Sequence, residues 1–278
     1  MKRRTFIGGS IAALANLAAL STAAFPGTLS IFAQRLRDAR PFVAYDAELA
    51  LPSASIIKLV ILTALAREID TGAMRWDDML TLQTREIVGA SESFGNAKAG
   101  ARATVRRLTV AMVTQSDNTA ANVLADHLSF QRVNAVAESL DLTRTRLRRH
   151  FMDFAARARG IDNTTSAADM GRLLLGIERG ARGASTRVAS HASCHEMVEI
   201  MLRQEDRDTI PAGIHRRVAI ANKTGVLPDV RADVAIVDPF GRDPYVVALL
   251  SQFKPAMATR AYARLRAIAG DVDAQSAR

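Results

Sequence analysis

The chain has 278 residues, of which 49% are hydrophobic and 23% are charged, and its net charge is +9. This composition is typical of an ordinary globular protein with one large core or two joined lobes. The arginines cluster without interleaved aromatic residues, as between Arg144 and Arg149, which argues against nucleic-acid binding and predicts a solvated basic face. The single cysteine, Cys194, excludes an intramolecular disulfide.

Residues 1–24 are predicted to be an export signal. Residues 2–4 are basic, residues 6–20 are apolar, and residues 21–24 have the small side chains of a cleavage site. The Arg3-Arg4 pair is also typical of twin-arginine export. The apolar run is short and rich in Ala and Gly, which argues against a membrane span. We expect a periplasmic or secreted protein with no stable membrane span after signal removal, and an uncleaved N-terminal helix is the alternative.

A β-hairpin and a buried helix are predicted next. Gly27–Gln34 and Pro41–Asp46 are β-rich runs separated by a polar, arginine-rich turn, which predicts the hairpin. Nearly every residue from Ile56 to Leu65 is apolar, the pattern of a helix buried on all sides. Pro52-Ser53 is typical of a helix start, and Asp70-Thr71-Gly72 of a helix end.

Ser55 and Lys58 begin this predicted helix and share one face of it. A lysine in so apolar a setting is costly unless it is paired or loses its proton, and a neutral amine can activate a nearby hydroxyl. We therefore predict that Ser55 is a nucleophile and Lys58 its base. The S-x-x-K pattern also arises by chance, with the lysine reaching solvent from a helix end, so this interpretation depends on further motifs.

The long middle of the chain, from Ser53 to about Glu205, predicts helices and loops without a strand. A helix over Thr104–Thr114 runs into Ser116-Asp117-Asn118, and another helix follows over Thr119–Leu128. A hydroxyl, a carboxylate and an amide at such a junction suit a polar loop that lines a cleft. The alternative is a plain N-terminal cap of the second helix.

Strands return near the C-terminus. The expected strands are Arg217–Thr224, Ala232–Val237 and Tyr245–Ser251, and Pro255–Gly270 is expected to form an amphipathic helix. Together with the hairpin, they predict one antiparallel sheet assembled from both ends of the chain.

The predicted fold class is therefore α+β in two lobes. Residues 25–52 and 206–278 are expected to form a sheet-and-helix lobe, and residues 53–205 an inserted all-α lobe. We expect Ser55, Ser116 and Lys223 to converge in the cleft between the lobes.

Lys223-Thr224-Gly225 is predicted to end the first of these strands. Lys223 and the Thr224 hydroxyl can hold a substrate carboxylate, while Gly225 lets a peptide-like ligand lie against the strand edge. Arg231 either adds a second positive charge near the carboxylate or is a surface arginine.

The three motifs S-x-x-K, S-D-N and K-T-G occur here in the order found in class A β-lactamases and penicillin-binding proteins. The spacing of 61 residues between Ser55 and Ser116 also suits that family. From about Gly27 to the C-terminal helix, the chain resembles the class A β-lactamases and their relatives, the penicillin-recognising serine acyl enzymes.

This resemblance implies roles for further residues. Ser116 would pass a proton to the leaving nitrogen, Asn118 would bind the substrate's side-chain amide, and Asp117 would hold the loop in shape. The backbone N–H groups of Ser55 and Val226 would form the oxyanion hole.

One family motif is missing. The E-x-x-L-N loop of class A enzymes, whose Glu activates the deacylating water, has no counterpart, and an ungapped overlay puts Phe151 at the Glu and Ala155 at the Asn. Asp153 is the nearest carboxylate that could replace the Glu, although an Asp there is more often a loop brace. Asp162 is expected to pair with Arg149 and to brace the end of the loop.

No metal or organic cofactor is implied. The run His191-Ala192-Ser193-Cys194-His195 holds three candidate ligands, but on one helix they cannot all face one ion, so we predict that Cys194 packs in the core.

The leading hypothesis is a periplasmic, monomeric class A β-lactamase-type hydrolase that opens a β-lactam or related amide through a Ser55 acyl-enzyme. The alternatives are a D,D-peptidase resembling penicillin-binding proteins, acting on peptidoglycan-like peptides, and a sensor that traps β-lactams without turnover.

Overall fold

The structure of the protein, a computed structural model, describes residues 25–277, so the predicted export signal lies outside the described residues. The strands are β1 (Gly27–Arg35), β2 (Val43–Tyr45), β3 (Leu51–Pro52), β4 (Met79–Thr81), β5 (Arg102–Thr104), β6 (Thr164–Thr165), β7 (Ile220–Leu227), β8 (Val230–Val237) and β9 (Tyr245–Phe253). The helices are α2 (Lys58–Asp70), α3 (Val105–Thr114), α4 (Asn118–Leu128), α5 (Phe130–Ser139), α6 (Phe154–Ala158), α7 (Ala167–Ala181), α8 (His191–Leu202), α9 (Ile210–Gly213) and α10 (Ala258–Ser276). Within residues 25–277 no helix is long and apolar enough to cross a membrane.

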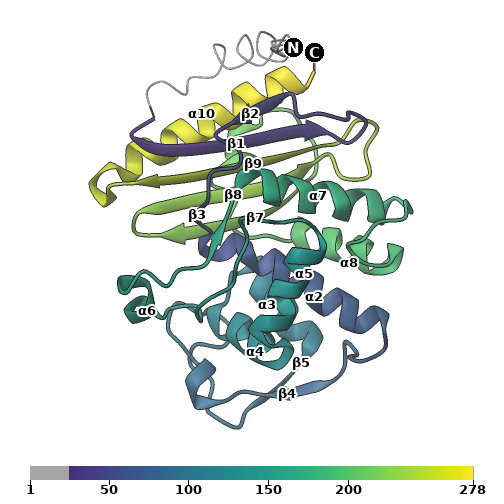
Figure 1. Cartoon of the computed structure of the whole chain (residues 1–278), viewed down its shortest axis with the longest axis vertical. Coiled ribbons are helices and arrows are strands. Elements are labelled where there is room, and N and C mark those ends of the chain that lie inside the picture. The colour runs from purple at the N-terminus through teal and green to yellow at the C-terminus, as the bar shows by residue number, and fades with distance from the viewer. Residues whose placement is uncertain (1–24, 278) are drawn as a thin grey trace, which may run out of the picture.

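Five strands form one antiparallel sheet in the order β2-β1-β9-β8-β7. Strand β1 pairs along its whole length with β9, from Gly27 opposite Phe253 to Arg35 opposite Tyr245. Both ends of the chain therefore build the sheet, as the sequence predicted. The predicted N-terminal hairpin is confirmed by the pairing of β1 with β2, and β7 lies at the opposite edge, facing the helical part of the molecule (Figure 1).

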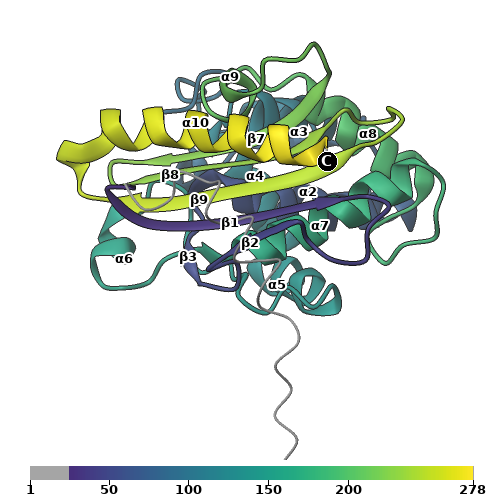
Figure 2. The ribbon, with the colours of Figure 1, turned by 90° about the horizontal axis from the view of Figure 1, so that it is seen from above.

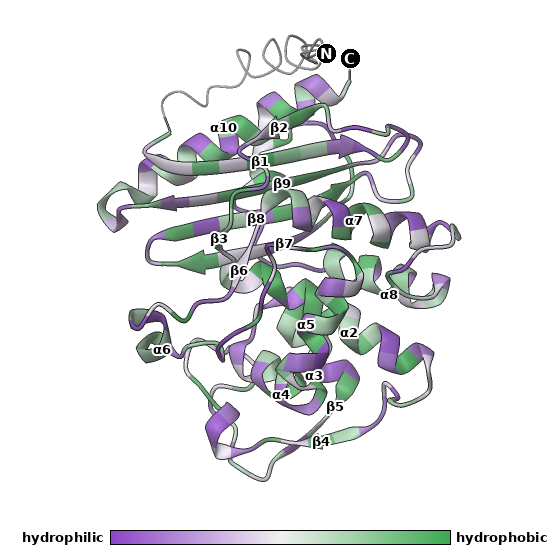
Figure 3. Ribbon diagram, viewed as in Figure 1, coloured by the Kyte–Doolittle hydropathy of each residue, from purple (hydrophilic) through white to green (hydrophobic). Residues whose placement is uncertain are grey.

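Helices cover both faces of the sheet (Figure 2). On one face, α10 packs Leu265 and Ile268 against sheet residues such as Leu249, and hydrophobic and hydrophilic residues alternate along this helix (Figure 3). On the other face, α7 lies against β1 and β9. Gly171 of α7 has no Cβ at the place where the Phe32 ring packs, so helix and sheet approach closely. This layering confirms the predicted α+β class.

The helical part is built around α2. Every residue from Lys58 to Ala66 is buried, and α2 contacts α3, α4, α5 and α8. A helix surrounded on all sides has no need of a polar face, which explains its nearly continuous apolar sequence. The predicted buried helix is confirmed, but its first turn, Ala54–Ile57, is a 3₁₀ turn and the α-helix begins at Lys58.

Two local predictions were wrong. Between Ser53 and Glu205 the structure has the short strands β4, β5 and β6, which are two or three residues long and therefore too short to produce a recognisable alternation. Strand β7 also continues beyond the K-T-G motif to Leu227, which pairs with Val230 across a tight turn. The motif consequently lies within an edge strand and not at its end.

Candidate active site

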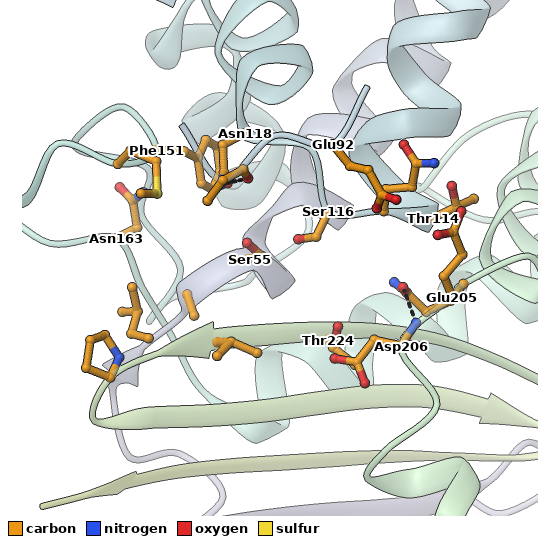
Figure 4. A pocket seen from close by; sticks show the side chains of 18 of the residues that line it. Ser55, Glu92, Thr114, Ser116, Asn118, Phe151, Asn163, Glu205, Asp206 and Thr224 are labelled. Atoms are coloured by element: carbon orange, nitrogen blue, oxygen red, sulfur yellow. Dashed lines mark hydrogen bonds between the residues drawn. The ribbon is translucent and has the colours of Figure 1, made fainter. Parts of the chain in front are cut away.

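A cleft of about 680 Å³ lies between β7 and the helical part of the molecule. Its walls bring together Ser55, Ser116, Asn118, Thr224 and Val226, which come from three separate stretches of the chain (Figure 4). The three sequence motifs therefore meet in one place.

Lys58, three residues after Ser55, is fully buried. Its Nζ donates to the carbonyl oxygens of Ser116 and Asp117, at 2.5 and 3.3 Å, and to Asn118 Oδ1 at 2.9 Å. Burial and then the positive charge of Lys223 lower the pKa of Lys58 well below its usual range, although Asp117 opposes them. An amine that readily loses its proton can act as a base toward a nearby hydroxyl.

The Ser116 hydroxyl lies between two buried amines. Its Oγ is 3.3 Å from Lys58 Nζ and 3.0 Å from Lys223 Nζ, and the latter also donates to the Thr224 carbonyl at 2.9 Å. Burial lowers the pKa of Lys223 to about 7, against the opposing charges of nearby carboxylates. Lys223 is 0% exposed, so its amine lies beneath the surface of the cleft.

The backbone around the cleft adopts sparsely populated conformations. Ala54, Ser116 and Met152 have φ values of 44°, 59° and 67°, and all three line the cleft. Each such conformation costs about 1–3 kcal/mol and persists only where the surroundings enforce it. The residue after Ser116 is fixed by its side chain, because the Asp117 carboxylate caps α4 at the Ala120 N–H and also accepts from the Phe94 N–H.

Gly225 allows β7 to approach the nucleophile turn. A Cβ at this position would lie 3.0 Å from the Ser55 nitrogen, 3.0 Å from Ala54 Cβ and 3.1 Å from the Ser53 oxygen. Any larger residue would therefore push the strand away from Ser55. Val226, the next residue, lines the cleft and is half exposed, so its backbone stands beside the same turn.

Phe151 occupies the part of the cleft wall next to Lys58. Phe151 is 6% exposed, and the centroid of its ring lies 4.6 Å from Lys58 Nζ. Asn122 holds the Phe151 backbone from both sides, because its Oδ1 accepts the N–H at 2.9 Å and its Nδ2 donates to the carbonyl at 3.3 Å. An aromatic ring, with no carboxylate, thus lines the cleft at this point.

The carboxylates of this loop have structural contacts. Asp153 caps α6, accepting from the Ala156 N–H at 2.8 Å, and it does not line the cleft. The predicted brace is confirmed, since Asp162 Oδ1 lies 2.7 Å from Arg149 Nη2. Ala155 is exposed on α6, away from the cleft lining, so the overlay that put it at the family's Asn does not describe the three-dimensional arrangement.

Arg231 is neither a free surface arginine nor available to a ligand. Its Nη1 and Nη2 donate to the two carboxylate oxygens of Asp206, at 2.7 and 2.9 Å, and its Nε donates to Thr209 Oγ1 at 2.7 Å. Burial opposes ionisation of Asp206, but Arg231 together with the Thr224 hydroxyl and a backbone N–H lowers the pKa of its carboxyl overall.

Several residues that line the cleft were not identified from the sequence. Glu92, Glu205, Asp206 and Tyr262 line the cleft but belong to no motif, and only the fold brings them there. Asn163 also lines the cleft, and its Oδ1 accepts hydrogen bonds from the backbone N–H groups of Arg148 and Arg149. Its position directly after Asp162, the predicted brace of the loop, could have indicated this role in the sequence. In residues 25–277 no group of three His, Cys, Asp or Glu side chains could hold a metal ion. Cys194 is buried, as predicted.

Comparison with known proteins identifies the family. The sequence profile of the beta-lactamase enzyme family matches residues 11–273. The chain belongs to this family. Among solved structures it is similar to PBP-A, with 25% identity and a TM-score of 0.82 over 94% of this chain and 93% of that one. A variant of a class A β-lactamase of the last common ancestor of Gram-negative bacteria matches at 24% identity and a TM-score of 0.82, over 97% of this chain and 100% of that one.

A β-lactamase from Xanthomonas campestris matches at 23% identity and a TM-score of 0.81, over 94% of this chain and 96% of that one. A search of curated proteins by sequence finds no match. The predicted class A β-lactamase-like fold is thereby confirmed, and the protein is a β-lactamase-like serine hydrolase by family.

Proposed function

We propose that the protein is an exported serine hydrolase that opens the amide bond of a β-lactam, or of a related compound, through an acyl-enzyme on Ser55. The observation that carries this proposal is the buried cluster of two amines around one hydroxyl, with Ser116 Oγ 3.3 Å from Lys58 Nζ and 3.0 Å from Lys223 Nζ, beside Ser55 in one cleft. The basic, twin-arginine start of residues 1–24 supports export.

Acylation begins when Ser55 Oγ attacks the carbonyl carbon of the substrate and its proton passes to Lys58 Nζ. The negative charge that develops on the carbonyl oxygen is stabilised by the backbone N–H groups of Ser55 and Val226. The C–N bond then breaks, and the leaving nitrogen takes the hydroxyl proton of Ser116. Lys58 returns the proton to Ser116, which leaves an ester on Ser55.

Hydrolysis of that ester needs a water molecule and a base, and the resemblance to class A enzymes places both where Phe151 lies in this chain. The ring there is buried beside Lys58 and offers no proton acceptor, and Asp153 is committed to its helix cap. A well-placed general base typically contributes about 10²–10⁴-fold, so the acyl-enzyme should be long-lived.

This feature favours a second candidate function, a D,D-peptidase of the penicillin-binding type or a β-lactam sensor. In these proteins a β-lactam adduct persists because deacylation of that adduct is not their task. One solved structure similar to this chain, at 25% identity and a TM-score of 0.82, is a point mutant of PBP-A in an acyl-enzyme complex with penicillin G.

The test combines a chromogenic cephalosporin with intact-protein mass spectrometry. The wild type should give a burst equal to the enzyme concentration and a covalent adduct, Ser55→Ala should give neither, and Ser185→Ala, at an exposed serine outside the cleft, should behave as wild type. Fast steady turnover would favour a β-lactamase, and hydrolysis of a D-Ala-D-Ala peptide would favour the peptidase. An adduct that persists in Ser55→Ala would refute the assignment of the nucleophile.

A further inference from the structure

The two parts of a substrate lie on opposite sides of Ser55 in the proposed reaction. Ser116 gives its proton to the leaving nitrogen, so the leaving group, which carries the carboxylate of a penicillin, lies on the Ser116 side. On the other side of Ser55, away from Ser116, the cleft is lined by Phe151 and Asn163 (Figure 4). The side chain of the acyl group therefore extends toward these two residues.

Apolar side chains from two segments line this end of the cleft. Met152 and Phe154 follow Phe151 in the loop, and Leu227 and Pro228 follow Val226 at the end of β7. Phe154 is 44% exposed although it is aromatic, Pro228 is exposed, and Met152 and Leu227 are half-buried. Apolar surface that faces water in a concave site is what an apolar group of a ligand covers.

An ion pair holds these two segments against each other. Arg157 of α6 donates through Nη2 to both carboxylate oxygens of Asp229, in the turn between β7 and β8, at 2.7 and 2.9 Å. Gln252 donates to the same carboxylate at 3.1 Å, and Arg157 Nε donates to Asp162 within the loop at 3.0 Å. The loop and the turn therefore lie side by side, and their apolar side chains form two walls whose separation is fixed.

Charged side chains are distributed unevenly along the cleft. In the part of the chain that the structure describes, its charged lining residues are Glu92, Arg149, Glu205 and Asp206. The three carboxylates lie on the side of Ser116 that faces away from Phe151 (Figure 4). Arg149 is 6% exposed and is bonded to Asp162 and to a backbone carbonyl. A charged group on the acyl side chain would therefore lose water without gaining an unpaired partner of opposite charge.

We propose that Met152, Phe154, Leu227 and Pro228 form a subsite for an uncharged, apolar acyl side chain of aryl size, and that the enzyme disfavours acyl donors with a charge there. The proposal rests on the proposed acylation of Ser55 and names the substrate class of that site. An aryl group between the two walls leaves water and covers apolar surface of the protein as well as its own.

Three penicillins with the same bicyclic nucleus, and hence the same leaving group and carboxylate, provide the test. Benzylpenicillin has a phenylacetyl side chain, 6-acetamidopenicillanic acid has an acetyl group in its place, and carbenicillin is benzylpenicillin with one added carboxylate on the side chain. The second-order rate constant of acylation is measured by intact-protein mass spectrometry of quenched samples and divided by that of hydroxide-catalysed hydrolysis. We expect benzylpenicillin to exceed each of the other two by about tenfold or more, the factor that a few pocket contacts or one unpaired charge supplies.

Two variants at the exposed Phe154 assign the preference to the subsite. Phe154→Ala should narrow the ratio of benzylpenicillin to the acetamido compound, and Phe154→Lys should narrow the ratio of benzylpenicillin to carbenicillin, because it supplies a cation to the added carboxylate. Ile161→Ala, at an exposed apolar residue of the same loop that does not line the cleft, should keep both ratios of the wild type.

The outcomes separate this inference from the proposed function. Equal rate constants for the three penicillins, or ratios in both Phe154 variants that match those of the wild type, would overturn the inference while acylation of Ser55 stands. No adduct with any of the three penicillins would overturn the proposed function and this inference with it.

Discussion

Replacing Lys223 by Met removes a buried amine and should change how the stability of the protein depends on pH. Burial lowers the pKa of Lys223 from 10.5 to about 7, and the charges of Asp233 and Asp206 only partly oppose this. Between these pH values the unfolded chain holds a proton that the folded protein has released. The free energy of unfolding of the wild type should therefore rise with pH in this window. Lys223→Met should lack the share of this rise that Lys223 contributes and keep the share of Lys58, whose pKa is also lowered by burial.

The expected size follows from the width of the window. One proton corresponds to about 1.4 kcal/mol per pH unit, so the interval from about 7 to 10.5 corresponds to about 5 kcal/mol. The mutant also loses hydrogen bonds to Ser116 and to the Thr224 carbonyl. That loss lowers the free energy of unfolding by the same amount at every pH and does not change its slope against pH. Burial, which is the larger cause of the lowered pKa of Lys58, remains in the mutant, and only the smaller contribution from the charge of Lys223 is removed.

Urea unfolding followed by circular dichroism at pH 7, 8, 9 and 10 measures the effect. The difference in unfolding free energy between wild type and Lys223→Met should grow in favour of the wild type by about 4 kcal/mol over these three units. Lys254→Met, at an exposed lysine, should run parallel to the wild type. If the unfolding free energies of wild type and Lys223→Met change with pH by the same amount, the conclusion that Lys223 is a deprotonated, buried amine at alkaline pH is refuted.

Three further substitutions test the cleft. Phe151→Glu places a carboxylate within reach of Lys58 and should shorten the life of the acyl-enzyme by about 10²-fold or more, measured by mass spectrometry after dilution from penicillin; an unchanged lifetime would show that the deacylating water lies elsewhere. Asp153→Ala should lower the free energy of unfolding by about 1 kcal/mol through the lost cap of α6, without changing that lifetime, and a longer lifetime would instead make Asp153 the base. Gly225→Ala should slow labelling by a fluorescent penicillin by at least about tenfold, because the added Cβ would lie 3.0 Å from the Ser55 nitrogen. Slower labelling accompanied by a large loss of unfolding free energy would instead indicate general disruption of the sheet.

Residue identity and order were enough to predict much of this protein. Ser55 and Lys58 on an apolar helix, followed by Ser116-Asp117-Asn118 and Lys223-Thr224-Gly225, predicted a serine acyl enzyme because each motif requires particular functional groups. The apolar sequence of α2 predicted its burial, since a polar face has nowhere to point inside a core. The pairing of Asp162 with Arg149 was predicted because two opposite charges lie near the ends of one loop.

The charges at the mouth of the cleft could not be predicted in this way. Asp206 and Arg231 are 25 residues apart, and the pairing of β7 with β8 together with the path of the chain after α8 brings them into contact. Asp153 looked like a possible base in sequence, but its backbone position at the start of α6 directs its carboxylate to a helix N–H. A motif is recognised by the residues it contains, whereas the charge that a substrate meets depends on which side chains from distant segments are already paired, and only the folded chain decides that.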